Sequence, residues 1–350
     1  MTAAEPIARV AIGLNAVVAV VDDGRPKVLC RCDEDGVFSL PYGPFDPARH
    51  RTFEIGLREW VTRQTQIDLG YIEQLYTFGD EGREAPAAAF QEGAGGERIV
   101  SVGYLALAPE PADVSAARGQ WRDWYDFFPW EDWRAGEPTA LSERVLPRLA
   151  EWAARASDEA ERAARARRID LAFGADGWEE ERALDRYELM YEADLVAEAV
   201  RDRGSDGPAR AEGAGPAGAP MASDHRRILA TAVGRLRGKL KYRPVVFRVT
   251  PPEFTLLDLQ RRVEALIGFS LHKQNFRRNV ETGGFVERTG ASERPPSGRP
   301  AAVFRASDRV RKELAAAGLT IPRLRRRARF FGDDDGGMTD AAGSDSATVA

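Results

Sequence analysis

The residues with the clearest chemical role lie in the segment SLHKQNFRRNVET, residues 270–282. His272, Phe276 and Val280 recur at intervals of four residues, which predicts the inner side of a helix that Ser270 caps. The outer side carries four long polar side chains: Lys273, Gln274, Arg277 and Arg278. Glutamine pairs with adenine, and arginine and lysine bind guanine edges or phosphates, so this helix is predicted to enter a groove of nucleic acid. The structural alternative is a solvated helix face.

A loop that follows this segment carries two further arginines. Arg294 and Arg299 lie among prolines and glycines between Thr289 and Pro300. Proline restricts the backbone of such a loop, while arginine reaches along a phosphate chain or into a minor groove. The loop is therefore interpreted as the wing of a hairpin.

The elements that must position these side chains follow residue 223. We expect helices at His225–Leu240, Thr255–Leu266 and Ser270–Thr282, a short strand at Pro244–Val249, and strands at Phe285–Arg288 and Ala302–Arg305. Thr255 is the expected N-cap of its helix and a candidate contact to DNA. Two helices followed by a hairpin are the order of a winged helix.

Charge is divided unevenly along the 350 residues. The formal net charge is −5, but residues 224–330 carry 25 basic and 9 acidic side chains, a net charge of +16. Residues 1–223 carry 25 basic and 41 acidic side chains, a net charge of −16. This asymmetry indicates a module that binds a polyanion, with nucleic acid as the first candidate.

Composition divides the chain into five parts. The segment 203–222 is rich in Gly, Ala and Pro and poor in large apolar side chains, so it is expected to be a flexible linker. The expected organisation is a mixed domain at 1–157, connecting helices at 158–202, this linker at 203–222, the basic module at 223–330 and a disordered acidic tail at 331–350.

The first part of the chain predicts a mixed α+β domain. Asp-Gly turns separate its first apolar runs, which favours antiparallel hairpins. Strands are expected at Val10–Val21, Pro26–Cys32, Gly36–Leu40, Tyr71–Phe78 and Ile99–Leu107, and helices at Arg51–Thr65, Leu141–Ala156 and Trp178–Val200.

Two other groups of residues have both a chemical and a structural interpretation. Cys30 and Cys32 are spaced as a chelating pair, but the chain holds only these two cysteines and three histidines, so reduced structural cysteines are favoured over a metal site. The aromatic segment Trp121–Arg134 contains four tryptophans that either stack on an adenine or pack in the core or between subunits, and packing is favoured.

The segment Leu40–Asp80 resembles the Nudix family in its order of strand, glycine loop, helix, loop and strand. Nudix hydrolases bind Mg²⁺ with the helix signature R-E-x-x-E-E-x-G, because a hard cation requires several carboxylates. Here the matching stretch begins at Arg58, and Thr62 and Arg63 stand where the paired glutamates belong. Glu54 and Glu59 remain, but at five residues apart they diverge by about 140° on a helix. We therefore expect no metal site, no cofactor and no catalytic residues.

Taken together, several motifs of the chain resemble the Nudix-related transcriptional regulators of NAD metabolism, and most of all their alphaproteobacterial branch. The motifs that carry this resemblance are EQLYTFGD (73–80), VSVGYLAL (100–107), RYELMYEADLVAEA (186–199), FTLLDLQ (254–260), NFRRN (275–279) and SGRPAAVFR (297–305). The resemblance implies a homodimeric repressor whose winged helices bind a palindromic double-stranded operator near NAD biosynthesis or salvage genes. It also implies that a degenerate Nudix-like sandwich domain at 1–157 senses a nucleotide such as ADP-ribose, NAD or another adenine nucleotide. Asn275 joins the candidate DNA-binding residues through the motif NFRRN.

Four residues are candidates for binding this effector because of their positions. Gln74, Thr77 and Asp80 lie on or just after a predicted strand, and Arg98 opens the next strand. The structural alternative is that they form hydrogen bonds on the surface of a hairpin.

Two rival functions remain at this point. The first is an active pyrophosphohydrolase of ADP-ribose or NADH with an appended nucleic-acid-binding domain, and the second is an RNA-binding or scaffold protein. The N-terminus lacks the pattern of a signal peptide and no apolar run approaches the length of a membrane span, so a cytoplasmic protein without a membrane partner is expected.

Overall fold

The computed structural model describes residues 10–34, 36–67, 69–83, 98–114, 119–174, 178–203, 217–293 and 300–316. Arg294, Arg299 and the acidic tail at 331–350 lie outside these ranges. No helix in the described ranges combines the length and the apolar composition that crossing a bilayer requires.

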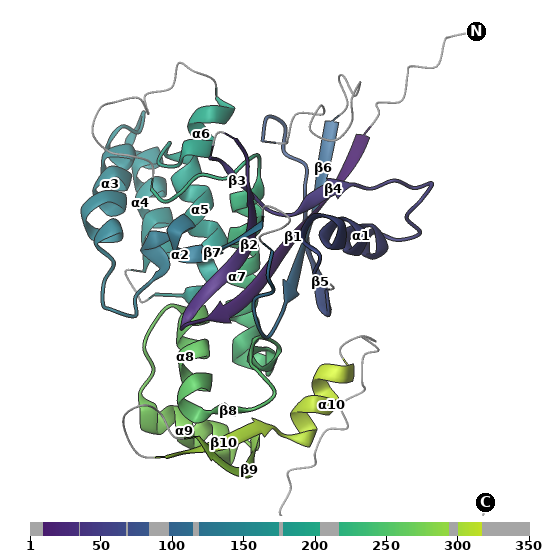
Figure 1. Cartoon of the computed structure of the whole chain (residues 1–350). Coiled ribbons are helices and arrows are strands. Elements are labelled where there is room, and N and C mark those ends of the chain that lie inside the picture. Colours follow the sequence, from purple (N-terminus) through teal and green to yellow (C-terminus); the bar gives the residue numbers. More distant parts are fainter. Residues whose placement is uncertain are drawn as a thin grey trace, which may run out of the picture.

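A seven-stranded mixed sheet forms the centre of the described chain (Figure 1). Its strands are β1 (Val10–Asp22), β2 (Arg25–Cys32), β3 (Phe38–Ser39), β4 (Tyr42–Pro44), β5 (Tyr71–Phe78), β6 (Arg98–Leu107) and β7 (Gly119–Asp123). The main order is β3-β2-β1-β6-β5, with β4 paired to β1 and β7 paired to β2. β1 and β6 run parallel, and the other pairs run antiparallel. The α+β class expected from the sequence is confirmed.

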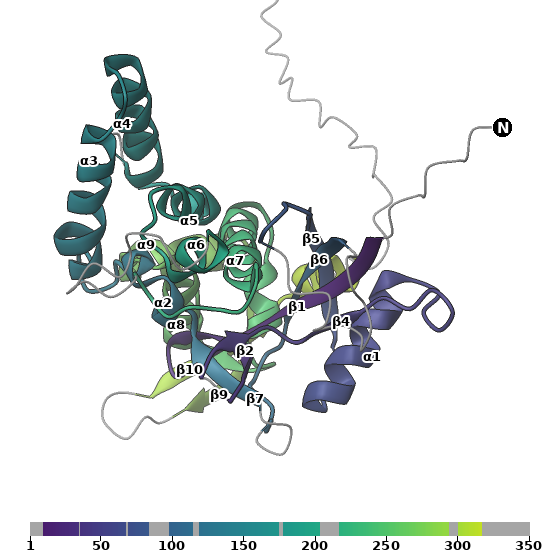
Figure 2. The same ribbon diagram turned by 90° about the horizontal axis from the view of Figure 1, so that it is seen from above.

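Both faces of this sheet are covered, which explains why β1 is a continuous apolar run. Alternate residues of β1 point to opposite faces. Leu14 and Val18 pack under α1 (Phe53–Thr65), where they contact the cluster of Leu57 and Val61. Val17 and Val21 belong to a second cluster on the other face. The first domain is therefore a three-layer sandwich (Figures 1 and 2).

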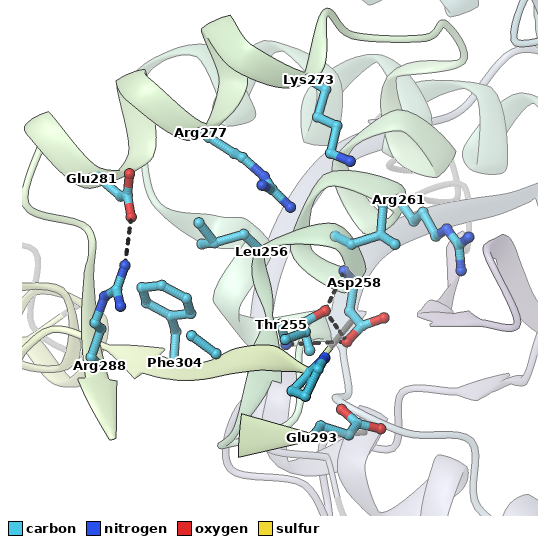
Figure 3. Close-up of a pocket in the computed structure, with 14 residues that line it drawn as sticks. Thr255, Leu256, Asp258, Arg261, Lys273, Arg277, Glu281, Arg288, Glu293 and Phe304 are labelled. Atoms are coloured by element: carbon cyan, nitrogen blue, oxygen red, sulfur yellow. Dashed lines mark hydrogen bonds and ion pairs between the residues drawn. The ribbon is translucent and has the colours of Figure 1, made fainter. Parts of the chain in front are cut away.

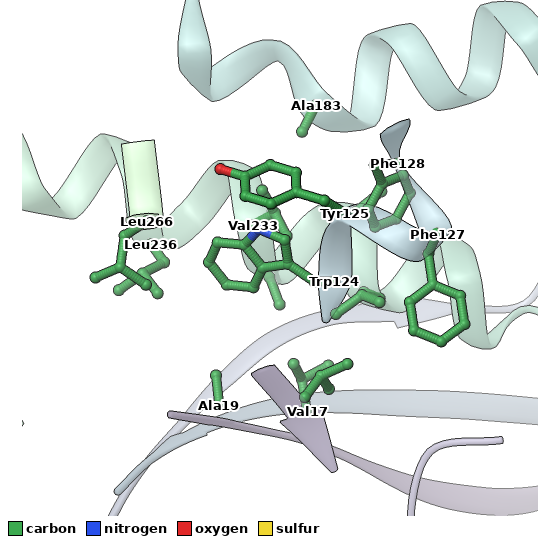
Figure 4. Close-up of a cluster of buried hydrophobic side chains, with 14 of the residues drawn as sticks. Val17, Ala19, Trp124, Tyr125, Phe127, Phe128, Ala183, Val233, Leu236 and Leu266 are labelled. Carbon is green, nitrogen blue, oxygen red and sulfur yellow. The ribbon is translucent and has the colours of Figure 1, made fainter. Parts of the chain in front are cut away.

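The second face packs against the aromatic segment and two helices. The aromatic segment forms α2 (Trp124–Phe127) and the single turn η3 (Pro129–Glu131), and the two helices are α5 (Ala183–Glu192) and α7 (His225–Tyr242). Trp124 and Trp130 are 1% and 0% exposed. Phe127 and Phe128 are buried in the same cluster as Trp124 (Figure 4). The aromatic segment is core, as its favoured interpretation predicted.

The connecting region differs from its predicted elements in two places. The predicted helix at Trp178–Val200 is broken into η5 (Glu180–Arg182), α5 and α6 (Ala197–Asp202), because Asp194 adopts a left-handed conformation with φ of 58°. The predicted helix at Leu141–Ala156 begins as a π turn, η4 (Leu141–Val145), before α3 (Leu146–Ala154). α3 and α4 (Glu159–Phe173) form a pair that stands away from the sheet (Figure 2).

The C-terminal end of the expected flexible linker is ordered. Met221 is 1% exposed, and its amide donates to Glu198 at 2.8 Å. The amide of Ala222 donates to the Phe38 carbonyl at 2.8 Å. Residues 217–222 are therefore packed against the sandwich because one large apolar side chain and a buried carboxylate fix them, while residues 204–216 lie outside the description.

The basic module contains the predicted winged helix. It comprises β8 (Phe254–Thr255), α8 (Leu256–Ile267), α9 (Lys273–Thr282), β9 (Val286–Glu293) and β10 (Ala301–Ala306), followed by α10 (Asp308–Ala316). β8, β10 and β9 form a three-stranded sheet in that order. α7, expected as the first helix of this module, packs against α5 and the large sheet.

Two local predictions in this module are wrong. Residues Val245–Val249 form a 3-10 turn, η7, rather than a strand. α9 begins at Lys273 with His272 as its N-cap, because the Ser270 hydroxyl instead donates to the Arg134 carbonyl at 3.0 Å.

Thr255 caps α8, as its sequence position predicts. Its hydroxyl accepts from the Asp258 amide at 3.2 Å, and the Asp258 carboxylate accepts from the Thr255 amide at 3.1 Å. Replacing Thr255 with alanine is expected to lower the free energy of unfolding by about 1 kcal/mol. Urea denaturation of Thr255→Ala and of the cap-preserving Thr255→Ser measures this. Equal losses in both variants would contradict the capping role.

Candidate nucleic-acid interface and nucleotide-binding region

A groove of about 940 Å³ runs between α8, α9 and the hairpin of β9 and β10 (Figure 3). Lys273, Arg277 and Glu281 line one wall, since they lie four residues apart on α9. Arg261 contributes from α8 and Arg288 from β9. Cationic side chains from three elements therefore line one concave surface, together with the carboxylates of Asp258, Glu281 and Glu293.

Most of these cations are free to bind an anion. Lys273, Arg277 and Arg261 are exposed, and within the described ranges none of the three has an ion pair or a side-chain hydrogen bond. Arg288 lies 3.9 Å from Glu281 across the groove, and its side chain is 71% exposed. Unpaired cations at a concave surface attract the phosphates of a polyanion.

Three other predicted DNA-binding residues lie on α9 beside this groove. Gln274, Asn275 and Arg278 are exposed on α9, and Arg278 donates to the Asn275 side chain at 3.4 Å. Phe276 and Val280 pack partly against the core, so the predicted inner side of the helix faces inward there. His272 is exposed.

Thr255 also lines the groove, but it is only 7% exposed, and its hydroxyl is bonded to Asp258. The sequence did not single out Arg261 or Arg288, because only the packing of α8 and β9 beside α9 brings them to the groove.

The four candidate effector residues lie on or beside strands β5 and β6. Gln74 is exposed and accepts a hydrogen bond from the Tyr104 hydroxyl at 3.4 Å. Arg98 donates to the Gly79 carbonyl just beyond the end of β5, and Thr77 pairs with Val102 in the sheet. Asp80 forms an ion pair with Arg227 of α7. Gln74 therefore lies with the α1 side of the sheet, whereas Asp80 is bound from the α7 side.

The region around Gln74 also includes a residue of α1. Tyr104 is largely buried, and this burial together with the nearby Glu54 carboxylate raises the pKa of its hydroxyl above the usual value. Glu54 itself forms an ion pair with Arg58 at 2.9 Å. Hydrogen-bonding groups of α1, β5 and β6 thus gather on one side of the sheet.

The carboxylates of α1 are engaged by cations. Glu59 forms an ion pair with Arg49 at 2.9 Å, another with Arg63, and a contact with the His50 ring at 3.3 Å. In the described ranges, no three His, Cys, Asp or Glu side chains gather as a metal site. Cys30 is buried and Cys32 half-buried, and both are free thiols.

A buried cluster of charges joins the end of β5 to α5 and α7. Asp224 is 6% exposed and lies 3.3 Å from Arg83 and 3.2 Å from Arg227. Burial raises the pKa of Asp224 to about 6, although both arginines oppose the rise. The sequence offered no signal for this cluster, because its members come from distant segments.

His225 lies next to this cluster and is held neutral. Burial, assisted by the positive charge of Arg201, lowers its pKa to about 3, and its Nδ1 accepts from the Leu40 amide at 3.0 Å. Below pH 6.5 the unfolded chain takes up a proton that the folded chain does not, so stability falls as the pH drops toward 3. Asp224 acts in the opposite direction, since its raised pKa lets the folded chain bind a proton first.

Substituting His225 with glutamine separates the two effects, because glutamine also accepts from Leu40. The stability of the wild type relative to His225→Gln is expected to fall by about 2 kcal/mol between pH 7 and pH 5. Urea denaturation at both pH values measures this difference. Parallel pH profiles of the two proteins would contradict a neutral His225.

A comparison with protein families matches part of the C-terminal module. Residues 246–306 match the family model of the NrtR DNA-binding winged helix domain. The chain is 38% identical over 85 residues to the ADPR responsive transcriptional repressor NtrR of Acinetobacter baylyi. That match covers 24% of this chain and 34% of the relative, so the chain spans about a third of its relative's length.

Two solved structures are also similar. Shewanella oneidensis NrtR complexed with a 27mer DNA has a TM-score of 0.49 and 20% identity, and the match covers 85% of this chain and 93% of that one. The NUDIX domain of the same protein complexed with ADP ribose has a TM-score of 0.29 and 25% identity, and the match covers 35% and 77% of the two chains.

Proposed function

Because residues 246–306 form a winged helix domain of the NrtR type, we propose that this chain is a transcriptional repressor that binds double-stranded operator DNA. The observation that carries the proposal is the set of unpaired cations on the groove, Lys273, Arg277 and Arg261, in the domain that matches the family model. α9 enters the major groove, and the hairpin of β9 and β10 is the wing.

The repressor acts as a homodimer in the cytoplasm on a palindromic site. Two winged helices related by a two-fold axis contact major grooves about 34 Å apart. The genes it controls belong to NAD biosynthesis or salvage, as the resemblance implies. Selection from a mixed random library of double-stranded DNA, single-stranded DNA and RNA tests this, since it should return a duplex with an inverted repeat whose half-sites lie about one helical turn apart. Enrichment of single-stranded or RNA ligands would overturn the proposal.

The sandwich domain senses a nucleotide, with ADP-ribose as the first candidate because the Acinetobacter baylyi relative is named ADPR responsive. We place the effector near Gln74, Thr77 and Arg98, where exposed polar groups of β5 and β6 lie beside α1. Asp80 contributes less directly, because Arg227 already engages its carboxylate.

The boundary between the two domains falls after α7. This helix packs against α5 and the large sheet, and the family match begins at residue 246. The linker at 203–222 therefore connects two parts of the sandwich domain rather than separating it from the DNA-binding unit.

The domain does not hydrolyse its nucleotide, because Glu54 and Glu59 are paired with arginines and Thr62 and Arg63 replace the signature glutamates. Incubation with ADP-ribose and Mg²⁺ is expected to release no AMP. The rival function, an active pyrophosphohydrolase, predicts Mg²⁺-dependent release of AMP that Glu59→Gln abolishes.

A further inference from the structure

The C-terminal end of α8 is fastened to the sandwich domain at several points. The Tyr125 hydroxyl donates to the Ala265 carbonyl at 2.8 Å, and the Trp133 amide donates to the Gly268 carbonyl at 2.6 Å. Arg262 donates to the carbonyl of Val21, the penultimate residue of β1, at 2.6 Å. Gly268 ends the helix with φ of 88°, and a Cβ there would overlap the Glu131 carbonyl. The contact is therefore a close, directional joint.

A buried triad of charges lies at the centre of this joint. Glu131 is 1% exposed, and the side chains of Arg186 and Arg237 are 0% exposed. Arg186 donates to both carboxylate oxygens of Glu131, from Nε at 2.5 Å and from Nη2 at 2.9 Å. Arg237 donates to the same carboxylate and, through Nε, to the Leu266 carbonyl at 3.0 Å. One carboxylate thus connects η3, α5, α7 and the end of α8.

The triad is electrically unbalanced in itself, with two cations for one anion. Backbone carbonyls compensate for the second cation: Ala172 and Glu179 accept from Arg186, and Glu180 accepts from Arg237, each at 3.0 Å. Burial opposes ionisation of Glu131, but the two arginines prevail and hold its pKa below the usual range. The Glu131 carboxylate is therefore ionised and hydrogen-bonded at neutral pH.

Breaking such a network by removing one member is costly, but replacing all of it by apolar side chains need not be. Well-packed apolar residues of the same volume are often as stable as a buried ion triad or more so, whereas directional hydrogen bonds fix one arrangement of the groups that they join. In this chain the groups so joined are the sandwich domain and the helix that precedes α9. The triad therefore sets the orientation of the winged helix relative to the sandwich.

We propose that the triad of Glu131, Arg186 and Arg237 is the joint through which the sandwich domain positions the DNA-binding unit and controls it. These are positioning residues for operator binding, and the inference rests on the proposed function. In a dimer, the angle at this joint sets the distance between the two α9 helices, so a loose joint weakens binding to two half-sites and leaves one half-site unaffected. The nucleotide signal passes through the same joint, because α7 packs against the large sheet and its Arg237 donates to the Leu266 carbonyl at the end of α8.

The test replaces the whole triad by apolar side chains, in the variant Glu131→Leu with Arg186→Met and Arg237→Met. Arg262→Met is a second variant in a half-buried position, and it removes the hydrogen bonds from Arg262 to the carbonyls of Val21 and Val249. Arg168→Met is the control, since it breaks an exposed ion pair with Glu192 away from the joint. Circular dichroism and urea denaturation establish that each variant is folded. If the triple variant fails to fold, Arg262→Met and the charge-preserving Arg237→Lys carry the test.

Two measurements are made on the folded variants. Spin labels are attached at Ile55→Cys on α1 and Asn279→Cys on α9, in a background that carries Cys32→Ser so that this half-buried thiol is not labelled. Electron–electron double resonance then gives the distance between the two domains. Labelled protein is diluted with unlabelled protein so that distances within one chain dominate. A narrow distribution is expected in the wild type and the control, and a broad one in the joint variants. Unlabelled joint variants should lose about tenfold in affinity for a two-half-site duplex and keep their affinity for one half-site.

A third measurement follows the response of the folded variants to ADP-ribose. The joint variants should still bind it, measured by calorimetry, but it should no longer change their DNA affinity. A distribution as narrow as in the control, or equal losses on one and two half-sites, would overturn the joint. Failure of the wild type to bind any duplex would instead refute the proposed function and leave the distance measurement as a test of the joint alone.

Discussion

Replacing Lys273 and Arg277 together with alanine is expected to lower the affinity for promoter DNA by about 10²-fold. Both side chains line the groove, both are exposed, and neither has a protein partner in the described ranges. We expect each to make one contact to a phosphate or a base edge, and the loss of one such contact costs about 1–3 kcal/mol of binding free energy. Fluorescence anisotropy with a labelled promoter fragment measures the loss.

The same experiment separates phosphate contacts from a general loss of charge. If both residues contact phosphates, the slope of log affinity against log salt should fall by about two. The control is Arg167→Ala with Arg168→Ala, which removes the same charge from α4, away from the groove. An equal loss in the control, or unchanged affinity in the groove variant, would show that α9 does not contact DNA.

Removing the carboxylate of Glu131 is expected to produce the largest loss of stability, about 3–5 kcal/mol. Glu131→Ala leaves Arg186 and Arg237 buried without their counter-ion, and both arginine side chains are 0% exposed. An unpaired buried charge costs far more than a missing surface ion pair. The midpoint and slope of urea denaturation give the difference from the wild type.

Glu151→Ala is the matched control for this prediction. Its ion pair with Arg155 is 3.6 Å long, and both side chains are well exposed. The control should stay within about 0.5 kcal/mol of the wild type. A loss in Glu131→Ala no larger than that of the control would mean that the triad is not the buried network described above.

Helices and strands whose sequence pattern lies within one short stretch of chain were predictable from the sequence. Alternating or continuous apolar runs located β1, β2 and β6 to within one or two residues, and β5 was predicted with its observed bounds, Tyr71–Phe78. The N-cap Thr255 was also predicted, since the capping box is written in consecutive residues. The polar side of α9 followed from helical spacing alone.

Features that depend on distant contacts were not predictable. The turn at Val245–Val249 has the β-branched composition of a strand, yet α7 and α8 pack around it as a 3-10 turn. Residues 217–222 have the composition of a linker, yet Met221 and Glu198 fix them. In the sequence, Glu131 is one of several acidic residues in the aromatic segment, and nothing there indicates a partner. Only the fold brings Arg186 and Arg237 to it. For the same reason, the sequence predicted only part of the candidate DNA-binding site. It identified Lys273 and Arg277 on α9, but Arg261 and Arg288 come beside them only in the folded chain.

We propose that the groove lined by Lys273, Arg277 and Arg261 binds duplex DNA under the control of a nucleotide. The most direct measurement is an anisotropy titration of the wild-type protein with its own promoter fragment and a shuffled duplex, at 50 and 200 mM salt, with and without ADP-ribose. With about 6–10 phosphate contacts, affinity for the promoter should fall by about 10³–10⁵ between these salt concentrations, exceed that for the shuffled duplex, and change when ADP-ribose is added. Equal affinity for both duplexes, or a flat response to salt, would contradict the account.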